Sequence, residues 1–506
     1  MRWPNIFAWA IAVLAGLALL ACSPREPGPS SSSPTAASAA SPSPTASPTA
    51  SPPTTPALDW QPCEPGFECA MLEVPLDYSG HESGTMDVPL VRHRATEPSQ
   101  RLGVLLANPG GPGASGVDFV VRSVAGWPEG LRQRFDIIGF DPRGVSGDTA
   151  VDCTDNLDAF YDADPSPDTP QEHDTLVAAY QRFARECEAR SGKYLPYIGG
   201  DVVVQDIDRI REALGEDKLS FLGLSYGTYL GAKYADRYPQ HVRAFVLDGP
   251  TDPSLPGKDW QLQQALGFET ALHAFLADCA SSSSCPFRSD GDPESAYDAL
   301  MADIEAAPVA VGSRTLGPGE ASTAVAAALY SKNAGWPRLA QALADAQAGD
   351  GGGLLGLFDG YVDRAPDGTY DDFGEVYRAI SCVDLDLPRD VAGFDAMAAE
   401  LSAASPRFGA TLAYEHLDCA FWPVHAPTPQ KVTATGAPPI LVVGTTRDPA
   451  TPLVWARSLA SQLESGVLLE LDGDGHVAFR KSRCIDSAIE RYLVDLELPS
   501  TGTVCS

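Results

Sequence analysis

The 506-residue sequence has few positive charges. It contains 35 Lys and Arg residues against 67 Asp and Glu residues, which gives a formal net charge of −32 at pH 7. Proteins that bind nucleic acid neutralise phosphates with Lys and Arg, so this balance argues against a nucleic-acid partner. Acidity on this scale indicates a soluble, self-repelling surface and does not identify a substrate.

The sequence also lacks the motifs of several common cofactor sites. It has no G-x-x-x-x-G-K-[ST] phosphate loop and no dinucleotide-binding glycine fingerprint. No Cys-x-x-Cys pair occurs, and the histidines do not cluster with the cysteines, which argues against zinc. No repeat with a period of about 20 to 50 residues is evident. We therefore expect no metal, no organic cofactor and no repeat architecture.

The N-terminus lacks a run of apolar residues long enough to span a membrane. The apolar stretch after Arg2 ends at Ala21 and is shorter than the roughly 20 residues of a membrane helix. It fits a signal peptide over residues 1–21. The segment Leu-Leu-Ala-Cys that ends at Cys22 looks like a bacterial lipobox, in which Cys22 carries two acyl chains, enough for stable anchoring. The sequence thus predicts a lipoprotein on the outer face of the bacterial cytoplasmic membrane, or a secreted protein if Cys22 is incidental.

Residues 22–57 contain almost no large apolar side chains and are rich in Pro, Ser, Thr and Ala. Such a segment cannot bury enough surface to offset the entropy lost on ordering. We expect a disordered tether that holds a folded domain away from the membrane.

Ten cysteines remain after Cys22, an even number that favours five disulfides in an oxidising compartment. Sequence alone does not determine their connectivity. As a hypothesis, pairing neighbours in order joins Cys63 to Cys69, Cys153 to Cys187, Cys279 to Cys285, Cys382 to Cys419 and Cys484 to Cys505.

Residues 58–250 alternate between strand and helix patterns. Apolar runs such as RLGVLLANPG, RFDIIGFDPRG, LSFLGLS and VRAFVLDG end in Gly, Pro, Asp or Ser, and helical patterns lie between them. Runs that are apolar throughout are typical of parallel strands buried on both faces. The alternation predicts an α/β fold with a mostly parallel sheet.

The alternation stops after Asp248. Residues 251–430 are Ala-rich and mainly helical, and the strand pattern resumes at Pro439 within a C-terminal part, 431–506. An insertion between two strands projects from one edge of a sheet and can cover a site there. We therefore interpret 251–430 as a helical cap; the alternative is an independent domain without a catalytic role.

The segment FLGLSYGTYLG contains the pattern G-x-S-x-G around Ser225. A strand pattern precedes it and a helical pattern follows, which is the context that a nucleophile elbow requires. Glycines allow the sharp reversal that exposes the serine Oγ above the sheet. The pattern predicts Ser225 as a nucleophile; the alternative is an ordinary Gly/Ser turn.

A serine hydroxyl needs a base, and the chain has only eight histidines. His476 lies in LLELDGDGHVAFR, directly after a strand pattern, at the sheet edge where α/β sites form. The others lie in strand or helix patterns or in the predicted cap. We predict His476 as the general base; the alternative is a solvated loop histidine.

The histidine in turn needs an acid to orient it. Asp448 follows the buried-strand pattern ILVVGTTR and precedes His476. A helix cap is the alternative role for Asp448, but Thr451 before Pro452 already has the pattern of an N-cap with proline at the first helical position. Asp248 is the rival acid. The chain order serine, aspartate, histidine is that of the α/β-hydrolase fold.

The glycine-rich segment NPGGPG, residues 108–113, follows the strand pattern GVLLA. In an α/β-hydrolase this loop helps form the oxyanion hole. We predict the backbone N–H groups of Gly111 and Tyr226 as its donors. Phosphate binding is the alternative, but the matching fingerprints are absent.

From about residue 58 to residue 505 the chain resembles the secreted bacterial tripeptidyl aminopeptidases, relatives of the proline iminopeptidases. The resemblance rests on the segments DWQPCEPGFECAMLEVPLDY, NPGGPGASG, FDPRGVSGD, GLSYGTYLGAKYAD, LDGPTDP, AISCVDLD, CAFWPV, DPATP and GDGHVAF. Proline iminopeptidases carry His-Gly where this chain has Asn108-Pro109, which disfavours a dedicated proline-releasing activity.

The resemblance implies cleavage of short peptides, tripeptides in the named family, from the free N-termini of peptides or proteins. Such an enzyme needs an anion to receive the substrate's ammonium group. Asp384, Glu375 and Asp386 in GEVYRAISCVDLD are candidates; the alternative is a solvated acidic face. An extracellular esterase or lipase with the same triad is the alternative function, and a catalytically inactive binding lipoprotein is a third. The oligomeric state stays open.

Overall fold

The computed structural model describes residues 58–506 of the chain. The predicted signal peptide (1–21), the tether (22–57) and the lipidation site Cys22 lie outside these residues and stay predictions. Between residues 58 and 506, no helix is both long enough and apolar enough to cross a bilayer.

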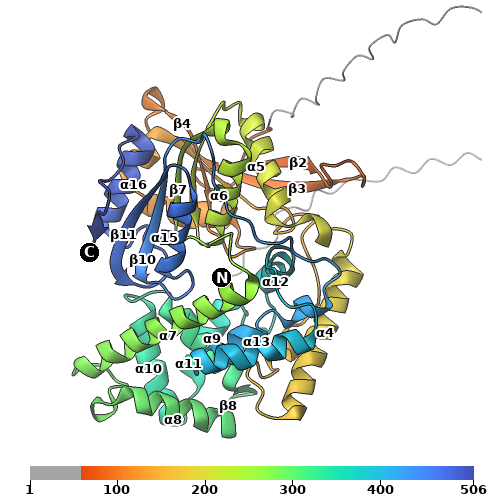
Figure 1. Ribbon diagram of the computed structural model, residues 1–506, viewed down its shortest axis with the longest axis vertical. Helices are drawn as coiled ribbons and strands as arrows, with labels where there is room; N and C mark the ends of the chain where they lie inside the picture. The colour runs from red at the N-terminus through yellow and green to blue at the C-terminus, as the bar shows by residue number, and fades with distance from the viewer. Residues whose placement is uncertain (1–57) are drawn as a thin grey trace, which may run out of the picture. The chain divides into compact units, whose positions relative to one another are not determined.

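A ten-stranded sheet forms the centre of the described residues, with the strand order β1-β2-β3-β5-β4-β6-β7-β10-β11-β12 (Figure 1). Its strands are β1 (Gln61–Pro62), β2 (Glu68–Pro75), β3 (Thr85–His93), β4 (Gly103–Asn108), β5 (Phe135–Phe140), β6 (Leu219–Leu224), β7 (Val242–Asp248), β10 (Ile440–Arg447), β11 (Gly466–Asp474) and β12 (Val504–Cys505).

The strands from β5 to β12 in this order run parallel, whereas β1, β2 and β3 pair antiparallel and β3 joins β5 antiparallel. Strands β4 and β6 are buried along their whole length, as their apolar runs predict. The mostly parallel sheet confirms the predicted α/β class.

Helices cover both faces of the sheet. Alternate residues of one strand point to opposite faces, so Leu106 and Phe221 pack with α5, α6 and α15, while Leu105 and Leu222 pack with α1, α2 and α16. The helices of this part are α1 (Gly116–Ser123), α2 (Glu129–Arg134), α3 (Asp158–Tyr161), α4 (Pro170–Ser191), α5 (Gly200–Leu214), α6 (Tyr226–Arg237), α15 (Leu453–Gln462) and α16 (Arg483–Asp495).

The segment between β7 and β10 is mainly helical, as the sequence predicts. It comprises α7 (Gly257–Ser281), α8 (Pro293–Ala306), β8 (Val309–Val311), β9 (Arg314–Leu316), α9 (Pro318–Leu329), α10 (Gly335–Gln347), α11 (Gly352–Tyr361), α12 (Phe373–Asp384), α13 (Val391–Ala404) and α14 (Gly409–Tyr414). Helices α7 to α11 build an apolar core of their own around residues such as Leu272 and Val325. Helices α12 and α13 instead pack into the main core through residues such as Val376 and Phe394. The assignment of 251–430 to one cap domain, and of 58–250 and 431–506 to a split core, stays a prediction.

Short 3₁₀ helices join several of these elements within the described range: η1 (Pro98–Gln100), η2 (Val124–Gly126), η3 (Leu195–Tyr197), η4 (Pro239–His241), η5 (Ser289–Gly291) and η6 (Leu417–Phe421).

Five disulfides form among residues 58–506, and they have the predicted sequential pairing: Cys63–Cys69, Cys153–Cys187, Cys279–Cys285, Cys382–Cys419 and Cys484–Cys505. Disulfides persist in oxidising compartments, so this set fits an exported protein.

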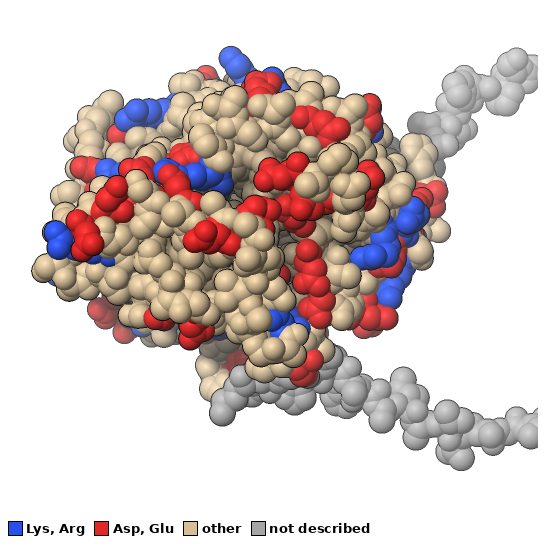
Figure 2. Space-filling view, turned by 90° about the horizontal axis from the view of Figure 1, so that it is seen from below, with Lys and Arg blue, Asp and Glu red and all other residues tan. Residues whose placement is uncertain are grey.

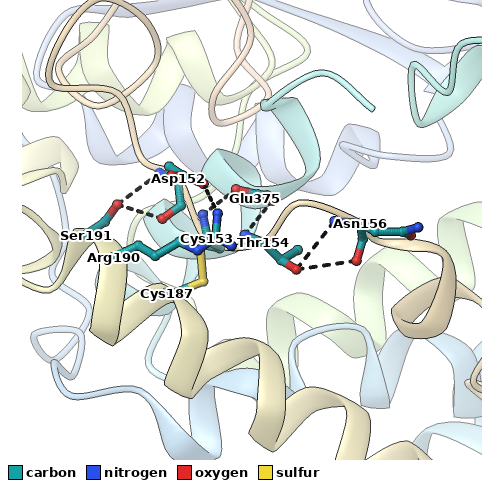
Figure 3. The surroundings of a disulfide bond; sticks show 8 residues. All are labelled: Asp152, Cys153, Thr154, Asn156, Cys187, Arg190, Ser191 and Glu375. Atoms are coloured by element: carbon teal, nitrogen blue, oxygen red, sulfur yellow. Dashed lines mark hydrogen bonds and ion pairs between the residues drawn. A yellow bond between two sulfur atoms is a disulfide. The ribbon is translucent and has the colours of Figure 1, made fainter. Parts of the chain in front are cut away.

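One disulfide, Cys153–Cys187, lies where helix α12 meets the core (Figure 3). It ties the loop around Cys153 to helix α4. The carboxylate of Glu375, in the first turn of α12, accepts the N–H groups of Cys153 at 2.6 Å and Thr154 at 3.1 Å. Glu375 therefore fastens α12 to the disulfide-linked loop.

The segment FDPRG places a fully buried arginine, Arg143, against helix α5. Its guanidinium makes two hydrogen bonds to Asp206, at 2.5 and 2.6 Å, and further bonds to the carbonyl oxygens of Pro75, Leu76 and Tyr197. A buried charge that loses its partner is strongly destabilising. Arg143 therefore joins the end of β2, the loop before α5 and α5 itself.

We expect Arg143→Met to lower the free energy of unfolding by about 3–5 kcal/mol, because it leaves the buried Asp206 carboxylate without the cation that neutralises it. Urea denaturation with the disulfides intact measures the loss. Arg122→Met is the matched control, since the ion pair of Arg122 with Asp118 is exposed, and a change within about 0.5 kcal/mol is expected there. Equal losses in the two variants would contradict the structural role of Arg143.

Candidate active site

Ser225 stands at a sharp turn between β6 and α6, as the G-x-S-x-G pattern predicts. Its backbone has φ 53° and ψ −128°, which few residues other than glycine adopt. A Cβ on Gly223 would lie 2.4 Å from the carbonyl oxygen of Gly227, and a Cβ on Gly227 would lie 2.6 Å from that of Asn108. Both flanking glycines are thus required by close backbone contacts.

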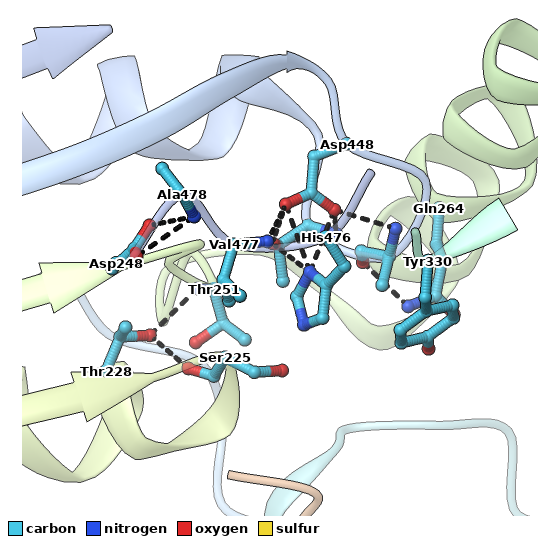
Figure 4. A network of polar contacts seen from close by, with 12 residues as sticks. Ser225, Thr228, Asp248, Thr251, Gln264, Tyr330, Asp448, His476, Val477 and Ala478 are labelled. Carbon is cyan, nitrogen blue, oxygen red and sulfur yellow. Dashed lines mark hydrogen bonds and ion pairs between the residues drawn. The ribbon is translucent and has the colours of Figure 1, made fainter. Parts of the chain in front are cut away.

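Hydrogen bonds connect this turn to residues of helix α6 and to the end of β7 (Figure 4). The N–H of Ser225 donates to the carbonyl oxygen of Asp248 at 3.0 Å. The hydroxyl of Thr228 donates to the carbonyl oxygen of Ser225 at 2.5 Å and accepts the N–H of Thr251 at 3.1 Å. The backbone of the candidate nucleophile is therefore tied to both neighbouring loops.

His476 follows the end of β11, and its Nδ1 lies 2.9 and 3.0 Å from the two carboxylate oxygens of Asp448. Asp448 is buried and also accepts the N–H groups of Ala450, Thr451 and Val477. Burial raises the pKa of a carboxyl group, but His476 and these donors outweigh it and leave the pKa of Asp448 below its ordinary value. Asp448 is thus an ionised partner for His476.

The prediction that Thr451 caps the following helix is wrong. Helix α15 begins at Leu453 without a side-chain cap. The hydroxyl of Thr451 instead lies 3.1 Å from Oδ2 of Asp448 and 3.2 Å from Nδ1 of His476. It therefore belongs to the candidate site, a role for which the sequence holds no signal.

Asp248, the rival acid, contacts the backbone of the histidine loop rather than the imidazole. Its carboxylate accepts the N–H groups of Ala478 at 3.0 Å and Phe479 at 2.6 Å. Burial raises the pKa of Asp248 to about 6. The geometry therefore favours Asp448 as the partner of His476.

The glycine-rich loop after β4 lies directly against the serine turn. A Cβ on Gly110 would lie 2.5 Å from the carbonyl oxygen of Leu224 and 2.8 Å from the backbone nitrogen of Tyr226. Gly110 donates its own N–H to the Asn108 side chain at 3.0 Å. The next residue, Gly111, lines the same cavity as Tyr226. This placement is compatible with the two predicted oxyanion donors.

A cavity of about 580 Å³ lies between these loops and the segment that connects β7 to β10. Ser225 and His476 line it on the core side. Tyrosines of the helical segment, among them Tyr330, Tyr361 and Tyr377, also line it. The candidate nucleophile and base therefore open into a cavity whose lining includes many aromatic side chains.

Two protein-family models match parts of this chain. The alpha/beta hydrolase fold matches residues 103–291, and TAP-like protein matches residues 405–505. Serine protease Hip1 of Mycobacterium tuberculosis is 37% identical over 88% of this chain and 91% of its own length. Carboxylesterase B of the same species is 36% identical over 87% and 86%. Tripeptidyl aminopeptidase of Streptomyces lividans is 31% identical over 89% and 86%.

The chain belongs to the tripeptidyl aminopeptidase-like family of α/β-hydrolases. Its relatives are similar over most of both chains, so the resemblance that the sequence motifs indicate is confirmed. The chain is a serine hydrolase.

Three acids are predicted to bind the substrate's ammonium group, and two of them, Asp384 and Asp386, line the cavity. Asp384 accepts the Tyr226 hydroxyl at 2.5 Å and the N–H of Gly200 at 3.0 Å. Burial raises the pKa of Asp384 to about 6. The structure does not bring Glu375 into the cavity, because its carboxylate is bonded to the disulfide loop.

Glu415 is a cavity residue that the sequence reasoning missed. It follows α14 and accepts the hydroxyl of Tyr377 at 3.1 Å through Oε1. Among the described residues its buried Oε2 has no hydrogen-bond partner. The imidazole of His416 lies 3.8 Å from it, but burial lowers the pKa of His416 to about 3, so that ring is neutral. No motif surrounds Glu415; only the fold places it here.

Two groups among the described residues have the spacing of metal ligands. Cys382, Asp418 and Cys419 form one, but its cysteines are joined as a disulfide and cannot ligate. The other is Asp164, Glu172 and Glu305, of which Glu172 caps helix α4. Neither group includes a residue of the candidate triad. The expectation that the protein needs no metal or cofactor stays a prediction.

We expect Gly110→Ala to reduce kcat/KM by about 100-fold or more. The new Cβ pushes the glycine loop off the serine turn, and one oxyanion donor can supply such a factor. Hydrolysis of a short peptide or ester measures the loss. Gly356→Ala in α11 is the control, since nothing lies within 4 Å of its Cβ position. Wild-type activity in Gly110→Ala would contradict the packing of loop against turn.

Proposed function

We propose that the chain is a serine exopeptidase that releases short peptides, three residues long, from free N-termini. The observation that carries the proposal is that Ser225 and His476 share one cavity with the acidic residues Glu415, Asp384 and Asp386. A positively charged N-terminus pairs with such residues. The step of three residues rests on the name of the Streptomyces relatives.

In the proposed mechanism Ser225 attacks the scissile carbonyl carbon while His476 accepts the hydroxyl proton. Asp448 holds the imidazole by its Nδ1–H and stabilises the imidazolium. The N–H groups of Gly111 and Tyr226 receive the developing oxyanion. His476 then protonates the departing amine, and a water molecule, activated by the same histidine, hydrolyses the acyl-enzyme.

Three carboxylates of the cavity are the proposed receptors of the substrate's ammonium group: Glu415, Asp384 and Asp386. Glu415 is the strongest candidate, because its Oε2 has no hydrogen-bond partner between residues 58 and 506 and the neighbouring tyrosine rings suit a cation, although burial raises the pKa of Glu415. Asp384 already has two donors but stays within the cavity. Acidic side chains are also numerous on the face seen in Figure 2, in keeping with the net charge of −32.

An esterase or lipase is the second candidate function. It is favoured by the relative named carboxylesterase B and by the aromatic lining of the cavity. A peptide and an ester substrate separate the two functions.

Mass spectrometry of one unblocked peptide and its N-acetylated twin tests the peptidase. We expect stepwise loss of N-terminal tripeptides from the unblocked peptide alone, and no products with Ser225→Ala. Inertness towards both peptides together with turnover of a short-chain ester would favour the esterase and overturn the proposal.

Glu415→Gln tests the amine site with the same pair of peptides. Loss of a charged hydrogen bond predicts a fall in kcat/KM of about 10- to 100-fold for the free peptide. Turnover of an ester without an ammonium group should not change. Asp384→Asn and Asp386→Asn are measured in parallel. An unchanged preference for free over acetylated N-termini in a variant removes that residue from the amine site.

Export is part of the proposal, with Cys22 as lipid anchor and the cell surface as location. The five disulfides support export. An acylated protein partitions into the detergent phase of Triton X-114, and Cys22→Ser should move it to the aqueous phase. The same phase for both proteins would contradict the anchor.

A further inference from the structure

Every backbone N–H group of the loop that carries His476 is hydrogen-bonded. Each N–H group from residue 475 to residue 481 has an acceptor. Backbone carbonyl oxygens accept three of them: Gly475 donates to Arg447, His476 to Tyr330 and Lys481 to Ala478. Carboxylates accept the other four: Val477 donates to Asp448, Ala478 and Phe479 to Asp248, and Arg480 to Asp486. A loop held at every residue keeps its side chains in one position.

Two of these N–H groups, those of Ala478 and Phe479, share one acceptor side chain, Asp248. Asp248 is the last residue of β7 and is fully buried. The flanking residues Val477 and Arg480 have φ values of 58° and 66°. Such left-handed conformations are costly for a β-branched residue and persist only where the surroundings hold them. Asp248 supplies that restraint from the core.

Asp248 also contacts the other half of the candidate catalytic pair. Its carbonyl oxygen accepts the N–H of Ser225 at 3.0 Å. One residue therefore holds the serine turn through its backbone and the histidine loop through its side chain (Figure 4). Asp248 does not line the cavity, so it has no contact with a substrate there.

On its opposite side the loop is held by the segment after helix α9. The carbonyl oxygen of Tyr330 accepts the N–H of His476 at 3.0 Å, and the Tyr330 ring packs edge-on against the imidazole at 5.1 Å. Ser331 and Gly475 form an antiparallel bridge. The ammonium group of Lys481 donates to the carbonyl oxygens of both Tyr330 and His476.

We propose that Asp248 is a positioning residue for His476, with Lys481 as its counterpart on the other side of the loop. The two side chains hold the loop between the core and the helical segment. This inference rests on the proposed role of His476 as the general base.

Above about pH 6, where Asp248 is ionised, the two side chains carry opposite charges, which gives their roles a signature in pH. Asp448 and Asp248 interact electrostatically with the imidazole, and the ammonium group of Lys481, which donates to the carbonyl oxygen of His476, interacts with both carboxylates. A nearby carboxylate stabilises the imidazolium form of a histidine, and a nearby ammonium group destabilises it. Because the base must be neutral, removal of Asp248's charge should move the acid limb of kcat/KM to lower pH. Removal of Lys481's charge should move it to higher pH.

The experiment compares Asp248→Asn, Lys481→Met and Lys481→Arg with wild type on one peptide substrate. An asparagine keeps the shape of Asp248 but presents an amide NH₂ to one of the two N–H groups. We expect kcat to fall about 10- to 100-fold in Asp248→Asn and roughly 3- to 10-fold in Lys481→Met. KM should not change. Lys481→Arg keeps the charge and the donors and should recover most of the activity.

Asp236→Asn is the matched control. The Asp236 carboxylate also accepts two backbone N–H groups, those of Thr433 and Ala434, but on a loop outside the cavity. The same chemical change there should leave kcat and the pH profile as in wild type.

Opposite displacements of the acid limb in Asp248→Asn and Lys481→Met support the proposal. A lower melting temperature with an unchanged acid limb in both variants, or a wild-type kcat in Asp248→Asn, overturns it. Ser225→Ala in the same assay separates this failure from failure of the proposed function. Activity in Ser225→Ala contradicts the triad itself, whereas its inactivity beside a wild-type Asp248→Asn contradicts only the role of Asp248.

Discussion

The contact between Asp448 and the imidazole of His476 organises the catalytic end of the sheet. Its two residues follow the neighbouring parallel strands β10 and β11, so the pair forms only when those strands are in register. Asp448 also accepts a backbone N–H group from each of the two loops, that of Thr451 after β10 and that of Val477 after β11. A buried carboxylate is tolerated because every one of these donors faces it. Loss of this pair would release both loops at once.

The helical segment between β7 and β10 contributes to the site in two ways. It lines the cavity with aromatic side chains and with Glu415, a proposed receptor of the substrate's ammonium group. It also contacts the catalytic loops directly: Gln264 of α7 donates to the carbonyl oxygen of Ala450, and Tyr330 accepts the N–H of His476. Enclosure strengthens electrostatic interactions, since less water screens them. The segment between β7 and β10 therefore supports the candidate catalytic loops as well as lining the cavity.

Sequence reasoning succeeded where chemistry is local. The strand–turn–helix context of Ser225 and the runs of buried apolar residues in β4 and β6 predict their own structure, because backbone sterics and burial act over a few residues. It failed where a side chain had two possible partners. Thr451 has the pattern of a helix cap, yet its hydroxyl bonds Asp448. Glu375 has the charge of an amine receptor, yet two backbone N–H groups far along the chain occupy it.

By itself the sequence determined the α/β class, an even number of cysteines that favours disulfides, and the chain order of the candidate triad. These follow from periodicity, parity and motif, which need no knowledge of distant contacts. Only the tertiary structure decided that Asp448 rather than Asp248 faces the imidazole, and that Glu415 enters the cavity. Two aspartates that end neighbouring parallel strands are equivalent in a one-dimensional pattern. Their partners differ because each meets different backbone donors and a different ring once the strands are packed side by side.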